Sequence, residues 1–177
     1  MKNRFALSVV MVFVLALGMA ALSACGSSEK PAEEGGGGSG ATLPNPQVEV
    51  PGPESFKEQL DIDLEPDPAG TNLSCAIIDD KLAQISYDVD VAGQPAMVVV
   101  RMQKTPAAED ISGINDSFTT VEPGKAVGDV APTLSFNEGE AGYAQWYDSA
   151  AGVSGTATLS SGASAEELDK LVALYVG

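Results

Sequence analysis

The sequence has 177 residues, of which 25 are Asp or Glu and 9 are Lys or Arg, so its formal net charge is −16 at pH 7. A nucleic-acid partner needs a stripe of cations that displaces counterions from phosphates, and this composition excludes one. The chain contains no histidine, which excludes Ser-His-Asp and Cys-His catalysis and most zinc sites. We expect no nucleic-acid partner, no metal and no cofactor.

The amino-terminal stretch predicts export and membrane attachment. Two basic residues precede an uncharged apolar run from Phe5 to Ala24, the pattern of a secretory signal over residues 1–24. The run ends in Leu22-Ser23-Ala24-Cys25, which resembles the lipobox of bacterial lipoproteins. That resemblance implies cleavage between Ala24 and Cys25 and a diacylglycerol on the Cys25 sulfur. The alternative is an uncleaved anchor, since about 20 apolar residues can also span a membrane. Both interpretations give a domain tethered to the extracytoplasmic face of the cell membrane.

A flexible linker is predicted between the lipidated cysteine and a folded domain. Residues 25–47 contain acids and the tract Gly35-Gly36-Gly37-Gly38-Ser39-Gly40, but almost no large apolar side chain that could offset the entropy lost on ordering. We expect a single domain over residues 48–177, a length that suits one hydrophobic core. Cys75 has no partner in the chain if Cys25 carries lipid, so we expect it to be a small buried side chain without a disulfide.

Residues 53–60 predict a short helix at the flank of the domain, because proline suits the first helical position and two apolar residues lie four apart. The following residues 61–68 carry alternate acids. An EF-hand calcium loop requires Gly and Glu where this stretch places Pro66 and Asn72. We therefore expect a solvated acidic loop there.

The centre of the domain predicts antiparallel strands. Apolar and polar residues alternate with period two from Ala83 to Val91, and residues 96–102 resume an extended run after a break, so the two should form a hairpin. Another strand is expected to start in residues 73–78. Further strands are expected near 118–121 and at 133–136, 143–147 and 153–159. In the last of these, Ser and Thr residues alternate with small apolar residues and form a face that we expect to meet solvent.

A closing helix should cover the dry face of the sheet. Ser164 and Glu167 form a capping box, and the apolar residues that follow fall on one helical face: Leu168, Leu171, Val172 and Tyr175. The predicted fold class is α+β, an antiparallel sheet of about 5–7 strands covered on one face by this helix and by the short N-terminal helix.

This layout resembles a known family. A short helix after Asn45-Pro46, a hairpin, the stretch Glu109 to Gly113, the strand Gly142 to Trp146 and a Ser-capped closing helix are similar to a small uncharacterised domain of Gram-positive envelope lipoproteins and anti-sigma-associated proteins. The outline is also similar to the curved sheets of lipoprotein-carrier and sigma-regulator sensor domains. The resemblance implies a concave apolar face as a possible ligand site, and it brings no activity with it.

The sharpest turn signal of the domain is Asp110-Ile111-Ser112-Gly113. Asp110 can accept a hydrogen bond from the Ser112 amide in an Asx turn, and Gly113 can adopt a positive φ. We interpret the motif as a structural corner between two strands, with a ligand-binding loop as the alternative. The one tryptophan, Trp146, is interpreted as a core residue and not as a ligand platform.

The sequence therefore predicts a membrane-anchored extracytoplasmic lipoprotein that acts as a binding or interaction module of the cell envelope. Its partners are the membrane, through lipid on Cys25, and a protein, a wall polymer or an apolar ligand. We expect a monomer that is not an enzyme. The alternatives are a hydrolase that uses carboxylates or a metal, and a passive surface lipoprotein.

Overall fold

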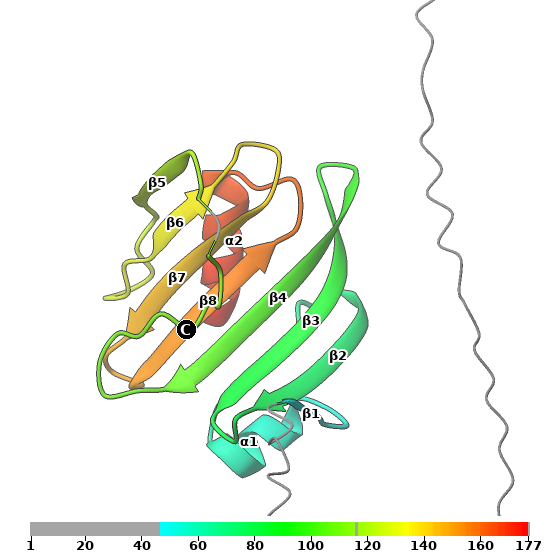
Figure 1. Cartoon of the computed structure of the whole chain (residues 1–177), viewed down its shortest axis with the longest axis vertical. Coiled ribbons are helices and arrows are strands. Elements are labelled where there is room, and N and C mark those ends of the chain that lie inside the picture. Colours follow the sequence, from blue (N-terminus) through cyan, green and yellow to red (C-terminus); the bar gives the residue numbers. More distant parts are fainter. Residues whose placement is uncertain (1–46, 116, 177) are drawn as a thin grey trace, which may run out of the picture. The chain divides into compact units, whose positions relative to one another are not determined.

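A computed structural model describes residues 47–115 and 117–176 of the chain. The signal peptide and the predicted lipid and cleavage positions, Cys25 and Ala24, lie outside the described residues. The described part contains eight strands and two helices (Figure 1): β1 Gln47–Glu49, α1 Glu54–Leu60, β2 Thr71–Ile78, β3 Leu82–Val91, β4 Gln94–Lys104, β5 Thr120–Pro123, β6 Thr133–Phe136, β7 Gly142–Asp148, β8 Val153–Leu159 and α2 Ala165–Tyr175.

The strands form one antiparallel sheet in the order β1-β2-β3-β4-β8-β7-β6-β5. The predicted α+β class is confirmed, with eight strands where the sequence indicated about 5–7. The extra edge strand is β1, whose three residues are all exposed and so show no alternation. A strand without a buried face leaves no period-two signal in the sequence.

The predicted hairpin is confirmed as β3 and β4, which pair from Leu82 with Gln103 to Val91 with Gln94. Its turn residues, Ala92 and Gly93, both have positive φ. Two positive φ angles give the turn a twist that matches the right-handed twist of the strands it joins. This hairpin forms the middle of the sheet, next to β8.

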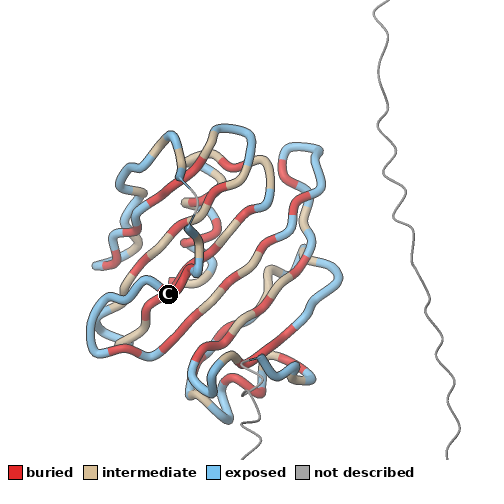
Figure 2. Tube along the Cα trace, viewed as in Figure 1, coloured by how far each residue is buried: buried red, intermediate tan, exposed pale blue. Residues whose placement is uncertain are grey.

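Burial alternates along the central strands, as Figure 2 shows for β3 and β4. One face, which we call the inner face, carries the hydrophobic core, and its central side chains on these two strands are fully buried: Ala83, Ile85, Tyr87, Val98 and Val100. The two helices pack on this face, α2 against β6, β7 and β8 and α1 against β3. The opposite, outer face carries the polar positions of the same strands.

The outer face is not a free solvent face, which corrects the expectation drawn from the alternation in β8. Ser154 and Thr156 are buried because the first part of the connection from β4 to β5, residues 105–115, crosses this face (Figure 1). The Ser154 hydroxyl accepts a hydrogen bond from the Glu109 amide at 3.0 Å and lies 2.9 Å from the Thr105 hydroxyl. A buried hydroxyl requires such partners, so the polar residues of β8 hold the crossing segment in place.

Each helix has a residue that fixes its place, an N-cap in α2 and a buried aromatic side chain in α1. The Ser164 hydroxyl accepts a hydrogen bond from the Glu167 amide, as the capping box predicts. The expectation that the first helix would only flank the core was wrong, because its residue Phe56 is fully buried in the hydrophobic core. Residues after α1 continue this cover, since Ile62 and Leu64 are buried while Asp63, which lies between them, is exposed.

Candidate functional site

The best candidate site is a cleft of about 320 Å³ on the inner face, where the cover supplied by α1 and the residues after it meets the C-terminal end of α2. We call it the inner cleft. Its lining residues come from both helices, from the ends of β4, β7 and β8 and from the turn between the last two: Lys57, Asp61, Ile62, Asp63, Met102, Lys104, Trp146, Asp148, Ala151, Val153 and Tyr175. Its volume lies at the lower end of the range for small-molecule sites, about 300–1,000 Å³.

The cleft floor is apolar and aromatic. Trp146 pairs with Gly155 across β7 and β8, and a Cβ placed on Gly155 would lie only 2.3 Å from Cε2 of the indole. The indole therefore occupies the space over Gly155 that the Cβ of any other residue would fill. The buried side chains of Ile62 and Met102 belong to the apolar part of the lining, and Ala151 and Val153 complete it. The prediction that Trp146 is buried is correct, and the ring also forms part of the cleft wall.

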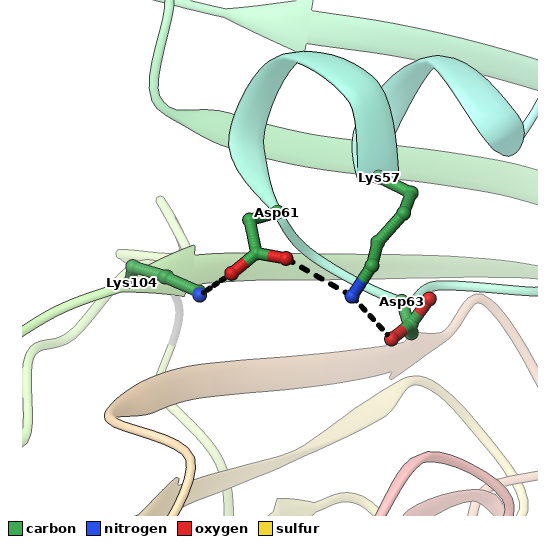
Figure 3. A network of polar contacts seen from close by, with 4 residues as sticks. All are labelled: Lys57, Asp61, Asp63 and Lys104. Carbon is green, nitrogen blue, oxygen red and sulfur yellow. Dashed lines mark hydrogen bonds and ion pairs between the residues drawn. The ribbon is translucent and has the colours of Figure 1, made fainter.

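Four charged side chains form a chain of ion pairs at the rim of the cleft (Figure 3). Lys57 Nζ lies 3.0 Å from Asp61 Oδ1 and 2.9 Å from Asp63 Oδ2. Lys104 Nζ, from the end of β4, reaches the other oxygen of Asp61 at 2.5 Å. The network ties α1 and the residues after it to the end of a central strand.

The network changes the protonation behaviour of its members. The hydrogen bonds from Lys104 and then from Lys57 lower the pKa of Asp61 to about 2. The hydrogen bond to Asp63, followed by that to Asp61, raises the pKa of Lys57 above its ordinary value. Both groups are therefore fully charged near neutral pH. Asp61 cannot donate a proton there, so it does not fit the role of a general acid.

Asp148 is the fifth charged group of the cleft and differs from the other four. Its Oδ1 accepts hydrogen bonds from the backbone amides of Ala150 at 2.8 Å and Ala151 at 3.0 Å. Among residues 47–115 and 117–176, no cation lies within ion-pair distance of it. The turn between β7 and β8 thus holds a carboxylate at the cleft whose charge no neighbouring side chain neutralises.

A pair of tyrosines fixes the α2 wall of the cleft. The hydroxyls of Tyr87, on β3, and Tyr175, in the last turn of α2, lie 2.6 Å apart. Burial, and then the hydrogen bond to Tyr87, raise the pKa of Tyr175 above its ordinary value, and burial also raises the pKa of Tyr87. Both hydroxyls stay neutral at physiological pH, so this contact holds the end of α2 against the sheet.

The loop candidates from the sequence lie on the other side of the sheet. Asp110 Oδ1 accepts hydrogen bonds from the Ser112 amide at 3.0 Å and the Ser112 hydroxyl at 2.7 Å, and Gly113 has φ +63°. The expected Asx turn and positive φ are therefore present. The Arg101 guanidinium, on the outer face of β4, donates to the Ser112 carbonyl and, at 2.8 Å, to Gln84 Oε1. The structure does not bring these residues to the inner cleft.

Sequence reasoning missed the charged residues of the cleft because it treated residues 61–68 as a solvated acidic loop. Their acids are exposed, but two of them pair with lysines. One signal could have pointed to them. Lys104 and Asp148 each continue the inner-face alternation of their strands, after Met102 and Trp146, and a charge at such a position predicts that the core opens there.

Within the described ranges, no group of three or more Cys, Asp or Glu side chains is placed to hold a metal ion. Cys75 is free and buried, and burial raises the pKa of its thiol. Neither α1 nor α2, the helices of the part that the structure describes, is long and apolar enough to cross a membrane. No family model, curated protein or solved structure matches the chain.

Proposed function

We propose that the protein is a lipid-anchored binding module of the cell envelope that holds a small molecule, or a small group of a larger one, in the inner cleft. Residues 1–24 act as its signal peptide, and Cys25 carries the lipid that places the domain on the extracytoplasmic face of the membrane. The strongly acidic composition disfavours contact between the folded surface and an anionic bilayer, so the lipid supplies the attachment.

The observation that carries the proposal is the cleft itself, which combines an apolar floor and a charged rim in one open cleft. A concave site that combines apolar and aromatic side chains with placed polar groups is a usual form of a binding site, and here five of the eleven lining residues are charged. The hydrolase alternative has less support, because Asp61 is held ionised between two lysines and hydrolysis by paired carboxylates needs one that can donate a proton.

The test begins with the protein purified from bacterial membranes in a non-ionic detergent. Intact mass should show loss of residues 1–24 and a diacylglycerol on Cys25, and the Cys25→Ala variant should escape processing. An unmodified cysteine or a retained signal segment in the wild type would contradict the anchoring.

Native mass spectrometry then tests occupancy of the cleft. The wild type should release a small molecule on denaturation, and Ala151→Phe should not, because Ala151 lines the cleft and the larger side chain narrows it. Ala150→Phe is the matched control, since this exposed neighbour belongs to the same turn and does not line the cleft. Equal occupancy of the two variants would overturn the binding proposal.

A further inference from the structure

The charges of the inner cleft do not balance. Lys57 and Lys104 are both engaged, since their ammonium groups contact Asp61 and Asp63. These two lysines and two aspartates neutralise one another as a group (Figure 3). Asp148 is left over, so the cleft carries one uncompensated negative charge, in a chain with 25 acids and 9 bases. A ligand that enters with a positive charge therefore meets a favourable potential.

The leftover carboxylate shares the cleft lining with an aromatic side chain, Trp146. Asp148 follows Trp146 by two positions on β7, so both side chains belong to the inner face, and both line the cleft. A carboxylate beside an indole is a suitable pair for an organic cation, because the ring attracts cations electrostatically while its apolar surface accepts alkyl groups. The Asp148 carboxylate is also pre-positioned, since two amides of its own turn hold Oδ1.

The same geometry discriminates against a metal ion. Hard divalent cations such as calcium take six to eight oxygen ligands, and within residues 47–115 and 117–176 no three acidic or thiol side chains come together to provide such a set. One free carboxylate in an otherwise apolar and ion-paired lining satisfies an ammonium group better than a bare ion.

From this juxtaposition we propose that the inner cleft binds small alkylammonium groups, with Asp148 as the counter-ion and Trp146 as the aromatic wall. The proposal rests on the proposed binding function and gives it a ligand class. It excludes anionic ligands of the same size, because these would meet the Asp148 carboxylate while the two lysines that line the cleft are already paired with aspartates.

The test uses the full processed protein in non-ionic detergent, with n-butylammonium chloride as the probe. Trp146 is the chain's single tryptophan, so its emission reports on the cleft without interference from another indole. We expect a saturable change with n-butylammonium, and none with 1-butanol or butyrate at the same concentrations and ionic strength. Added salt should weaken the binding.

The deciding variant is Asp148→Asn, which removes the charge and keeps the oxygen that accepts from Ala150 and Ala151. It should bind n-butylammonium roughly tenfold more weakly, the change expected for loss of a charged contact of about 1.4 kcal/mol. Glu138→Gln is the matched control, because it removes one exposed charge outside the cleft, and it should bind as the wild type does.

Several results would overturn the proposal. These are no response to n-butylammonium, an equal response to 1-butanol, or unchanged affinity in Asp148→Asn. If that variant failed to fold, Ala151→Phe compared with Ala150→Phe would decide, because only the former should lose the response. A co-purified neutral or anionic molecule that Ala151→Phe excludes would leave the binding function standing and refute the ammonium ligand alone.

Discussion

Replacement of Gly113 by alanine tests whether the segment that crosses the outer face is fixed by its own turn or by the sheet beneath it. Gly113 has φ +63°, and a Cβ at this position would lie 2.8 Å from Nη1 of Arg101. Two costs are therefore expected. A side chain at positive φ costs about 1 kcal/mol, and a displaced Arg101 loses its charged hydrogen bond to the Ser112 carbonyl, worth roughly 1.5–3 kcal/mol.

Gly128 provides the control for the first cost. It has φ +58°, and no atom lies within 4 Å of a Cβ built on it. Gly128→Ala should therefore lose about 1 kcal/mol of stability, for the positive φ alone, whereas Gly113→Ala should lose about 2.5–4 kcal/mol. Urea unfolding followed by far-UV circular dichroism measures both, provided that the denaturant slope is unchanged.

A double-mutant cycle with Arg101→Met isolates the contact with the sheet. In the Arg101→Met background the hydrogen bond to the Ser112 carbonyl is already absent. Gly113→Ala should therefore reduce stability no more than Gly128→Ala does. Equal losses for the two glycine variants in the wild-type background would refute the reasoning. That result would mean that Arg101 yields freely and that the Asx turn of Asp110 holds the crossing segment without help from β4.

Three further outcomes follow from the inner face. The pKa of Asp61 is about 2 in the folded state and 3.8 ordinarily, so the contribution of its ionised carboxylate to stability is present above pH 4 and is lost as pH falls towards 2. Asp61→Asn should therefore reduce the loss of stability between pH 4 and pH 2, measured by denaturant midpoints. An unchanged pH dependence would contradict the network. Tyr175→Phe should lose about 1 kcal/mol, since the Tyr87 hydroxyl loses its partner, and wild-type stability in urea would count against that contact. Gly155→Ala should lose roughly 1–3 kcal/mol through overpacking and shift the emission of Trp146 as the indole is displaced; unchanged emission would show that the ring does not need the glycine.

The elements that the sequence predicts well are those whose burial pattern is complete within a short stretch. In β3 the buried residues alternate with less buried ones from Ala83 to Tyr87, and the capped helix α2 buries residues at helical spacing. Such patterns need no knowledge of what lies opposite. The exposed β1 has no pattern of this kind, and only its pairing with β2 makes it a strand.

The predictions that failed depend on partners distant in the sequence. The polar face of β8 was expected to meet solvent, yet Ser154 is buried because Glu109, 45 residues away, lies over it. The acids after α1 are exposed as expected, but their local sequence did not show that Asp61 pairs with Lys104, which lies 43 residues away. The alternation of apolar and polar residues along a strand shows which face of the sheet a side chain lies on. It does not show which distant segment of the chain packs against that face.

The two faces of the sheet differ in what their side chains do. On the outer face, hydrogen bonds from buried polar side chains fix the crossing segment, so a substitution there should act mainly on stability. On the inner face, the hydrophobic core ends at Met102 on β4 and at Trp146 on β7. The next inner-face positions, Lys104 and Asp148, carry charges and line the cleft at the edge of the core. Because these charged side chains lie outside the packed core, their replacement should change what binds in the cleft more than whether the chain folds. The inner cleft is therefore the part of this domain where substitutions should change the surface chemistry while the fold is kept.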